Sequence, residues 1–244
     1  MRNIKIIIEY DGTNYCGWQY QKNTDQTIQQ KLEDALTKLN KAPVKVIGSG
    51  RTDSGAHALG QVANFQLDVP IPVERIPRAL NSVLPDDIIC KKAEAVADDF
   101  HARYQTRGKK YRYRFINRSY TSVFIRDFVY NIRQPLNINK MKAVIKDFQG
   151  THDFAAFQDS GSDKKDTVRT IASITMKEKS PEHWIEVKGN GFLYKMVRIM
   201  VGTLLEIGME KRKPDLKPIF KSKNRQQAGF TAPAKGLTLV EVYY

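Results

Sequence analysis

The segment Gly48–His57, which reads GSGRTDSGAH, combines a carboxylate, an arginine and a histidine with three glycines. Glycines let a backbone approach a ligand closely, so this loop could hold the Asp53 carboxylate at the end of a strand. The alternative is a tight turn in which Asp53 bonds the local backbone. Because Arg51 and His57 lie in the same loop of a basic chain, the functional interpretation and the tight turn are about equally supported.

A second group of interest is the run Lys109–Phe115. At strand period its aromatic side chains share one face and its basic side chains share the other. The aromatic face is typical of a core, and this is our interpretation for Tyr113 and Phe115. Tyr111 comes at the start of the strand, where an aromatic ring could stack on a base.

Arg198 stands out in the third group, Gly189–Arg198, which we place at a junction between a strand and a helix. It falls among apolar residues at helical period, and a buried cation is costly unless it is paired. A carboxylate from another segment would be a natural partner. A side chain that reaches solvent on the polar face of the helix fits the sequence as well.

Several common catalytic motifs are absent from the sequence. It has no phosphate-binding loop, no dinucleotide fingerprint and no nucleophile elbow. The four histidines never pair at metal-ligand spacing, and the zinc-deaminase pattern is missing. Phosphoryl transfer, hydride transfer and zinc hydrolysis therefore lose support, and the residues themselves identify no reaction.

The net charge of the chain suggests which kind of partner it binds. The chain has 40 Lys and Arg against 26 Asp and Glu, a net charge of +14, which favours a polyanion such as RNA or DNA. No signal peptide and no membrane-spanning run is recognisable. The two cysteines, Cys16 and Cys90, are expected to be buried free thiols. We therefore expect a soluble protein of the reducing cytoplasm.

Hydrophobic periodicity predicts a mixture of strands and helices. Expected strands cover residues 4–10, 44–47, 63–69, 88–96, 110–117, 128–133, 167–177, 183–188 and 237–244. Expected helices cover residues 28–39, with Thr27 and Gln30 at capping-box spacing, about 77–84, 137–149 and 193–207. Gly150 and Gly208 are expected as helix C-caps, and Asp159–Asp166 as a mobile loop.

Strands come in groups rather than in strict alternation with helices, which favours an α+β fold with antiparallel sheets. The polar stretch Asp99–Lys110 has no clear period and suggests a boundary. We predict two related βαββ-like domains, residues 1–104 and 105–244. The first would carry the Asp53 loop, and the second would carry the Tyr111 strand and the Arg198 helix.

A series of motifs resembles the tRNA pseudouridine synthase A family. The segment Gly50–Ala58 matches its signature, with Ala56 where Val is usual. Further similar segments follow in the family's order over nearly the whole chain: Tyr10–Thr13, Gly17–Gln19, Phe100–Arg103, Lys110–Tyr113, Gly150–Phe154, Gly191–Arg198 and Gly236–Tyr244.

The resemblance implies isomerisation of uridine to pseudouridine at tRNA positions 38 to 40, in the anticodon stem-loop. It implies no metal or cofactor, a homodimer, and a cleft between two related domains. By position, Asp53 matches the catalytic nucleophile, Tyr111 the active-site tyrosine, Arg198 the arginine that pairs with the aspartate, and Arg51 the arginine that helps to displace the base. RNA contacts are predicted for His57, Arg103, Lys109, Lys110 and Arg112.

The ionised Asp53 would attack either C1′ of the ribose or C6 of the ring, and the sequence leaves this choice open. It also leaves two other kinds of protein open. One is an RNA-binding or chaperone protein without catalysis, and the other is a metal-dependent nuclease that uses Asp53 and His57.

Overall fold

The computed structural model describes residues 1–161, 166–179 and 181–244 and divides the chain into two compact units. The first unit is Met1–Arg107 with Thr238–Tyr244, and the second is Gly108–Leu237. Both are α+β. The division after Arg107 lies close to the expected one, but the C-terminal segment groups with the first unit rather than with the second.

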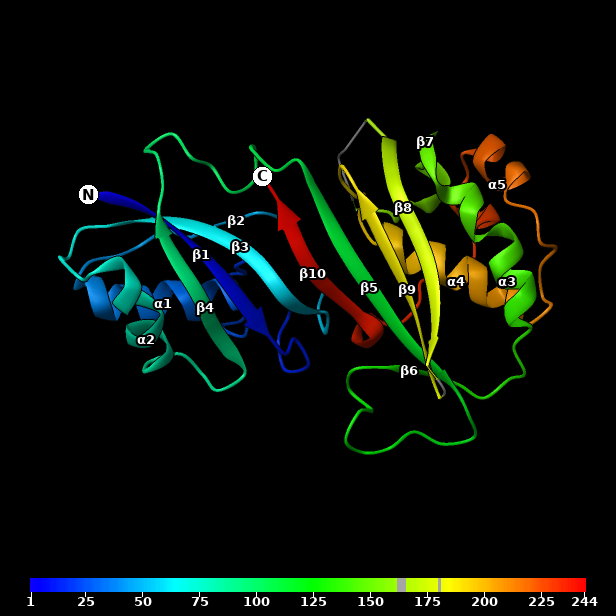
Figure 1. Ribbon diagram of the computed structural model, residues 1–244, viewed down its shortest axis with the longest axis horizontal. Coiled ribbons are helices and arrows are strands. Elements are labelled where there is room, and N and C mark those ends of the chain that lie inside the picture. Colours follow the sequence, from blue (N-terminus) through cyan, green and yellow to red (C-terminus); the bar gives the residue numbers. More distant parts are fainter. Residues whose placement is uncertain (162–165, 180) are drawn as a thin grey trace. The chain divides into compact units, whose positions relative to one another are not determined.

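The first unit is built on a mainly antiparallel sheet in the order β4-β1-β3-β10, with β2 paired to β3 (Figure 1). Its strands are β1 (Arg2–Tyr10), β2 (Ile47–Gly48), β3 (His57–Leu67), β4 (Ile88–Ala95) and β10 (Leu237–Tyr243). The exception to the antiparallel pattern is β10, which pairs with β3 in parallel through Thr238 and His57.

Alternation along β1 sets the core of the first unit. Ile4, Ile6 and Ile8 are fully buried, as their period of two predicts. Helix α1 (Ile28–Asn40) begins where expected, because the Thr27 side chain accepts a hydrogen bond from the backbone N–H of Gln30. The short helix η1 (Val73–Arg75) leads into α2 (Ile76–Asn81), and the buried residues of α1 and α2 complete this core.

The second unit has a sheet in the order β5-β9-β8-β7, antiparallel throughout, with the short β6 added in parallel to β5. The strands are β5 (Gly108–Asn117), β6 (Tyr130–Ile132), β7 (Gly150–Asp153), β8 (Val168–Lys179) and β9 (Glu182–Gly189). The helices are α3 (Ile138–Ile145), α4 (Met196–Gly208) and α5 (Lys217–Ser222), with short helices η2 (Lys146–Phe148), η3 (Ala155–Phe157), η4 (Arg225–Gln227) and η5 (Ala234–Gly236).

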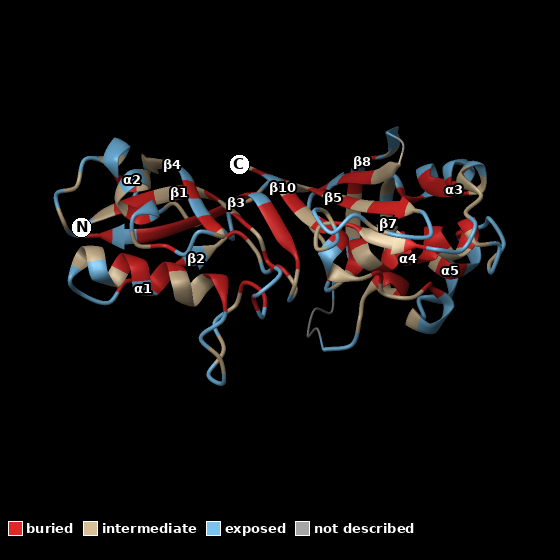
Figure 2. Cartoon of the chain, turned by 90° about the horizontal axis from the view of Figure 1, so that it is seen from below, coloured by how far each residue is buried: buried red, intermediate tan, exposed pale blue. Residues whose placement is uncertain are grey.

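Helix α4 is the central helix of the second unit and is buried along almost its whole length (Figure 2). It packs closely on α3, since a Cβ at Gly208 would lie 2.7 Å from the Met141 sulfur. A separate aromatic cluster fixes α5, where the Phe220 ring contacts Phe154 and Phe157 at centroid distances of 5.3 and 5.2 Å.

The two units begin with a similar order of elements along the chain. The first unit begins β1-α1-β2-β3, and the second begins β5-α3-β7-β8 when the three-residue β6 is set aside.

Several local predictions were wrong. The segment 44–46 is not a strand, and pairing is confined to Ile47–Gly48. Gly150 opens β7 at a φ of +110° instead of capping a helix, and α4 ends on Gly208 with Met209 as its cap. The strand β7 and the helix α5 were not predicted. Cys16 is exposed in the loop between β1 and α1, contrary to expectation, whereas Cys90 is buried on β4 as expected.

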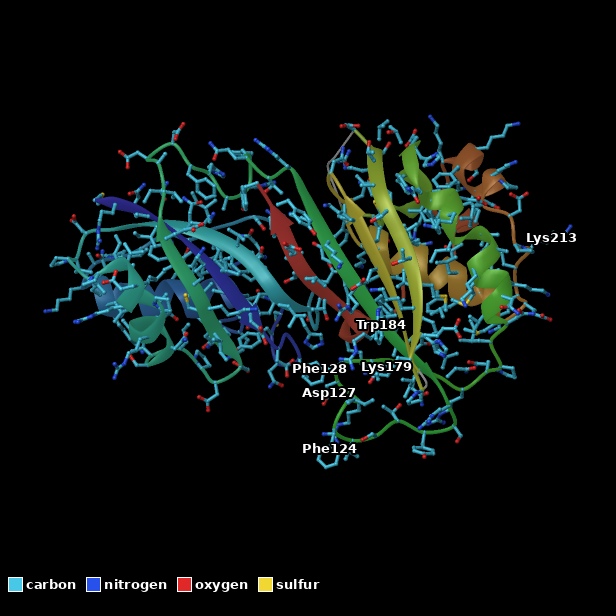
Figure 3. All side chains as sticks on the ribbon, viewed as in Figure 1. Phe124, Asp127, Phe128, Lys179, Trp184 and Lys213 are labelled. Atoms are coloured by element: carbon cyan, nitrogen blue, oxygen red, sulfur yellow. The ribbon has the colours of Figure 1, made fainter. Side chains whose placement is uncertain are left out.

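Two loops complete the second unit. The long connection between β5 and β6 carries Phe124, 89% exposed, at its outer end (Figure 3). Of the predicted mobile loop Asp159–Asp166, residues 162–165 lie outside the described residues.

Candidate active site

Asp53 lies half-buried in the loop between β2 and β3 of the first unit. The start of this loop is tied to β3 at two points. The Ser49 N–H donates to the Val62 carbonyl at 2.8 Å, and the Gln61 side-chain amide donates to the Gly50 carbonyl at 2.8 Å. The loop therefore leaves the sheet along a fixed path.

The residues around Asp53 are held by the segment that follows β1. The Trp18 N–H donates to the Thr52 carbonyl at 3.1 Å, and the Ser54 hydroxyl donates to the Tyr15 carbonyl at 3.1 Å. Within the loop, the Ala56 N–H donates to the Asp53 carbonyl at 3.1 Å. The backbone of Asp53 thus takes part in the local turn.

Thr52 is also fixed through its side chain. Its hydroxyl lies 2.8 Å from the hydroxyl of Tyr10 at the end of β1. Burial raises the pKa of Tyr10 above its ordinary value, more strongly than the hydrogen bonds to Thr52 and Gln61 lower it. The phenol therefore stays neutral at physiological pH and serves as a hydrogen-bonding group.

Two glycines make this close approach between segments possible. A Cβ at Gly12 would lie 2.0 Å from the Ala56 carbonyl oxygen, and one at Gly17 would lie 2.7 Å from the Thr52 carbonyl oxygen. Gly17 also has a φ of +90°, which L side chains rarely adopt. The motif segments 10–13 and 17–19 therefore serve to hold the Asp53 loop.

His57 is buried at the start of β3. Its Nδ1 lies 3.1 Å from the Gly12 backbone nitrogen and 3.1 Å from an Asp11 carboxylate oxygen. With its proton on Nε2 the ring accepts from Gly12, and with a proton on Nδ1 it donates to Asp11. Burial and these contacts favour a structural role for His57 over the RNA contact that we predicted from sequence.

Arg51 and Arg103 are exposed residues of the first unit. The Arg51 Nε donates to the Gln19 side-chain oxygen at 3.0 Å. The Arg103 guanidinium lies 5.8 Å from the ring centroid of Tyr104, which in turn stacks on His101 at 4.2 Å. Both arginines are thus accessible to an RNA while one side of each is held.

Tyr111 lies on β5 of the second unit and is 8% exposed. The Phe192 ring meets it edge-on at a centroid distance of 5.1 Å. Tyr113 and Phe115 are fully buried on the same face, which confirms their assignment to the core. Tyr111 is therefore a packed ring at the start of the strand.

Arg198 is half-buried on the first turn of α4. Its Nε donates to the Ala232 carbonyl at 2.7 Å, and its own carbonyl accepts from the Ala232 N–H at 3.1 Å. Burial raises the pKa of Tyr113, and the positive charge of Arg198 opposes this effect. Arg198 is thus neither deeply buried nor a fully solvated residue, because one edge of the guanidinium is fixed inside the second unit.

Lys110 and Arg112 point to the opposite face of β5, where Glu186 on β9 engages both. Arg112 donates from Nε and from Nη2 to one Glu186 oxygen at 3.0 and 2.8 Å, and Lys110 lies 3.5 Å from the same oxygen. Lys177 on β8 lies 3.2 Å from the other oxygen. Glu186 is 7% exposed, and three cations around one carboxylate keep this face basic.

Electrostatics agree with this geometry. Desolvation raises the pKa of Glu186. The hydrogen bonds from Arg112 and Lys177 and the charges of Arg112 and Lys110 together lower it by more, so the net shift of the pKa is downward. No pattern in the sequence indicated Glu186 as their partner. Two of the predicted RNA-contacting residues are therefore also members of an ion-pair network.

A sequence profile of the tRNA pseudouridine synthase family matches residues 6–105 and 144–244. These ranges contain Asp53, Arg51 and Arg198. The chain belongs to the tRNA pseudouridine synthase family. It is therefore an isomerase that forms pseudouridine from uridine in tRNA, and the predicted family is confirmed.

Curated tRNA pseudouridine synthases align with this chain from end to end. The tRNA pseudouridine synthase A of Acetivibrio thermocellus is 50% identical, and that of Thermoanaerobacter sp. is 49% identical, each over 100% of both chains. The tRNA pseudouridine synthase A 2 of Clostridium perfringens is 47% identical over 100% of both chains.

Similarity to solved structures is weaker. A chain of the archaeal box H/ACA sRNP Nop10-Cbf5 complex matches at 14% identity with a TM-score of 0.38, over 83% of this chain and 43% of that chain. The present chain thus spans less than half of that one, and this similarity carries no argument.

The structure places the predicted site residues of this pseudouridine synthase in both units. Asp53, Arg51, His57 and Arg103 belong to the first unit, and Tyr111, Arg198, Lys109, Lys110 and Arg112 belong to the second. Sequence reasoning missed Gln61, which is fully buried and holds Gly50 and Ser49. A signal was present, since an uncharged polar residue inside a strand must find partners when buried.

The part of the chain that the structure describes contains neither a candidate metal cluster nor a candidate membrane span. Within residues 1–161, 166–179 and 181–244, no three His, Cys, Asp or Glu side chains gather in a way that could hold a metal ion. Over the same part of the chain, no helix combines the length and apolar character needed to cross a membrane.

Proposed function

We propose that this pseudouridine synthase acts on uridines 38 to 40 in the anticodon stem-loop of tRNA, with Asp53 as nucleophile and without a cofactor. The observation that carries the assignment of Asp53 is the way its loop is held. Groups on both sides of Asp53 are anchored by hydrogen bonds to Tyr15 and Trp18, so this part of the loop is held in a defined position. The target positions and the absence of a cofactor rest on the family resemblance.

The target uridine must first leave the base stack, which costs a few kcal/mol. We propose that Arg51 offsets part of this cost by occupying the vacated position and contacting phosphate. Its exposed guanidinium, held through Nε, suits this role. Other basic residues, including Arg103, Lys109, Lys110 and Arg112, would bind the phosphate backbone, so tRNA affinity should fall steeply with added salt.

Two nucleophilic routes give the same product. In the first, an Asp53 oxygen bonds to C1′ of the ribose, the bond between C1′ and N1 breaks, and N1 takes the electron pair. In the second, the Asp53 oxygen adds to C6 of the ring before that bond breaks. In both, the uracil turns and C5 bonds to C1′. The bond from the Asp53 oxygen to C1′ or to C6 breaks and returns its electron pair to the carboxylate. The proton on C5 is lost, and N1 gains a proton. Atoms and electrons balance without an added reactant.

Tyr111 and Arg198 are assigned to the same reaction by the resemblance. Tyr111 would stack on the uracil and could take the C5 proton, while Arg198 would favour the ionised form of Asp53. Both are fixed within the second unit, Tyr111 by Phe192 and Arg198 by Ala232. A preorganised partner loses little entropy when substrate binds.

Release of tritium from tRNA that contains 5-tritiated uridine tests the proposal. The native chain should release tritium and leave the RNA strand intact, also in the presence of a chelator. Asp53→Asn should stop release while changing the tRNA dissociation constant by less than about tenfold, roughly 1.4 kcal/mol.

The rivals predict other results. Full activity of Asp53→Asn would remove Asp53 from the reaction, no release by the native chain would favour an RNA-binding protein, and strand cleavage sensitive to chelator would favour a nuclease. Mapping of pseudouridine in tRNA from a deletion strain tests the target positions.

We further propose, from the resemblance, that the enzyme works as a homodimer in the cytoplasm. Light scattering during size-exclusion chromatography should give twice the monomer mass of 27.9 kDa. A monomeric peak that retains activity would contradict the dimer.

A further inference from the structure

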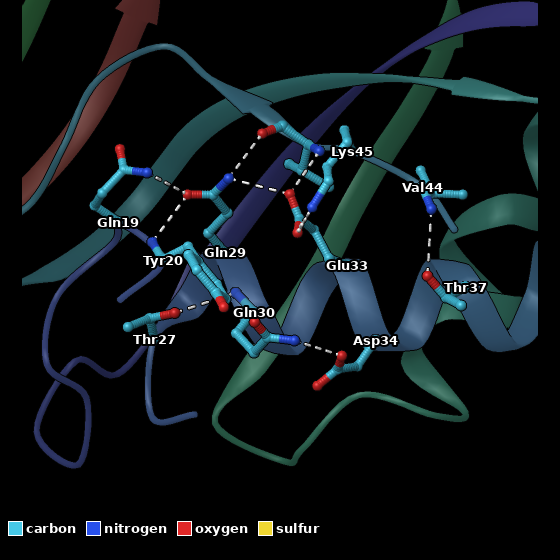
Figure 4. A network of polar contacts seen from close by, with 11 residues as sticks. Gln19, Tyr20, Thr27, Gln29, Gln30, Glu33, Asp34, Thr37, Val44 and Lys45 are labelled. Atoms are coloured by element: carbon cyan, nitrogen blue, oxygen red, sulfur yellow. Dashed lines mark hydrogen bonds and ion pairs between the residues drawn. The ribbon is translucent and has the colours of Figure 1, made fainter. Parts of the chain in front are cut away.

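Arg51 is joined to helix α1 by a chain of side-chain hydrogen bonds that its proposed role does not by itself require. Its Nε donates to the Gln19 oxygen at 3.0 Å, and the Gln19 amide nitrogen donates to the Gln29 oxygen at 2.9 Å. The Gln29 amide nitrogen then donates to Glu33 at 3.1 Å (Figure 4). We propose that Gln19, Gln29 and Glu33 form a relay that positions Arg51 for displacement of the target base.

Glu33 lies at the end of this relay, and contacts to both of its carboxylate oxygens hold it in place. It is 6% exposed on α1, and one of its oxygens accepts from the Val46 N–H at 3.1 Å as well as from Gln29. The other oxygen faces the Lys45 ammonium at 3.3 Å. A carboxylate buried to this extent is stable only with such partners, so its position is tightly defined.

Gln29 is fully satisfied. Its nitrogen donates to Glu33 and to the Val46 carbonyl, and its oxygen accepts from Gln19 and from the Tyr20 N–H at 3.0 Å. An amide has two donor hydrogens and two acceptor lone pairs, and all four are used here. The Gln29 amide therefore has a single favourable orientation, since the flipped amide would turn its nitrogen toward the donors of Gln19 and Tyr20.

The acceptor at the Glu33 end of the relay determines which atom of the Gln19 amide faces Arg51. Ionised Glu33 only accepts, so the Gln29 nitrogen must face it and the Gln29 oxygen must face Gln19. The Gln19 nitrogen then faces Gln29, and the Gln19 oxygen faces Arg51. The buried charge thus ensures that Arg51 meets an acceptor. A reversed relay would place an amide nitrogen against the guanidinium.

The relay holds Arg51 through one nitrogen. Within the described residues, its side chain has a hydrogen bond from Nε alone, and the residue is exposed. The two Nη groups, with their four donor hydrogens, stay available for phosphate or for a base edge. Gln19, Gln29 and Glu33 are accordingly positioning residues, and this inference rests on the proposed function of Arg51.

Helix α1 supplies a matched control. Gln30 donates to Asp34 at 2.6 Å with the same four-residue spacing that joins Gln29 to Glu33 (Figure 4). In this second pair Gln30 is half-buried and Asp34 is exposed, and the pair does not reach the Asp53 loop. Gln29→Leu breaks the relay, and Gln30→Leu breaks only the neighbouring pair. The two variants lose the same chemical group from adjacent positions.

The first measurement does not depend on the reaction. The proton–nitrogen NMR signal of the Arg51 Nε–H group is assigned by its loss in Arg51→Lys, and its heteronuclear NOE reports motion on the ps–ns timescale. Gln29→Leu should lower this NOE, and Gln30→Leu should leave it unchanged. An unchanged NOE in Gln29→Leu overturns the relay.

The second measurement is the single-turnover rate of tritium release at saturating enzyme. Gln29→Leu should lower the rate roughly tenfold to a hundredfold, the range expected when a remote change misplaces an active-site group. The tRNA dissociation constant should change little. Gln30→Leu should keep the native rate.

A double-mutant cycle separates positioning from general damage to the fold. Once Arg51→Ala has removed the group that is positioned, adding Gln29→Leu should slow the reaction no further. Additive losses, or a native rate in Gln29→Leu beside a slow Arg51→Ala, overturn the positioning role. A native rate in Arg51→Ala overturns the proposed role of Arg51 and the function of the relay with it, and the NMR result then still shows whether the contact itself exists.

Discussion

Hydrogen bonds to backbone groups hold the loop that carries Asp53, whereas apolar packing holds the helix that carries Arg198. Around Asp53 the anchors are main-chain and polar side-chain groups of Tyr15, Trp18 and Gln61. In α4 nearly every neighbour of Arg198 along the helix is a buried apolar side chain. A loop has no period of its own and needs many specific bonds, while a helix orients a side chain once its apolar face is packed.

The difference implies two ways of failure. A change that shifts the segment 10–18 should misplace Asp53 without unfolding the second unit. A change in the packing of α4 should cost stability first and move Arg198 as a consequence.

The largest effects are expected from two glycines, one in each region. Gly12→Ala would place a Cβ 2.0 Å from the Ala56 carbonyl oxygen, and Gly202→Ala would place one 1.7 Å from the Phe230 carbonyl oxygen. Overpacking typically costs about 1–3 kcal/mol. Both should lower the melting temperature, and both should slow the reaction by up to about a hundredfold.

Calorimetry beside single-turnover rates shows whether the comparison holds. Relative to its loss of stability, Gly12→Ala should show the larger loss of reaction rate. Gly202→Ala should show the larger loss of stability. The matched control is Gly161→Ala, where a Cβ would meet nothing within 4 Å, although its φ of +93° adds some strain. The reverse ranking would contradict the contrast between the two regions.

A smaller combined effect on stability and rate is expected from a conservative change of Arg198. Arg198→Lys keeps the charge but loses the planar group that donates to Ala232 while presenting its other nitrogens. Loss of one charge-assisted hydrogen bond costs about 1.5–3 kcal/mol, so kcat should fall roughly tenfold to a hundredfold. The kcat of Arg198→Met should fall further, because this variant also loses the positive charge. Equal rates for the two variants would show that the charge of Arg198 is unimportant.

Tyr111 should respond less strongly. Tyr111→Phe keeps the ring and its contact with Phe192, whereas Tyr111→Ala removes about 1–3 kcal/mol of stacking on a base. Phe should therefore be the milder substitution in kcat/KM. Equal losses in the two variants would assign the effect to the hydroxyl, as expected if it takes the C5 proton.

The smallest effect is expected at Glu186, on the opposite face of β5. The pKa of this carboxyl is lowered in the folded chain, so its contribution to stability is present above the unfolded value of about 4.3 and is lost as pH falls through the lower folded value. Glu186→Gln should remove this part of the acid dependence.

The same substitution also tests the basic face. Without the carboxylate, Lys110, Arg112 and Lys177 keep their charge, so tRNA affinity at low salt should rise modestly and its salt dependence should steepen. Melting curves between pH 3 and 7 and binding at two salt concentrations are the measurements. An unchanged acid profile would mean that the three cations do not stabilise Glu186.

Much of the fold could be predicted because it rests on local rules. The period of Ile4, Ile6 and Ile8 gave β1, and the capping spacing of Thr27 gave the first residue of α1. Prediction failed where tertiary context overrides local preference. Helix α5 has only six residues and is fixed by the contacts of Phe220 with a distant aromatic cluster, which no local pattern reveals.

The candidate site shows the same division. The types and spacing of residues in Gly48–His57 singled out Asp53, and the ordered motifs identified the family, because chemistry and motif order are written in the chain itself. Only the tertiary structure decided what holds these residues: Tyr15 and Trp18 for the loop, Gln19 for Arg51, and Glu186 for Arg112. A hydrogen bond depends on distance and direction, and folding alone brings together atoms from segments far apart in sequence.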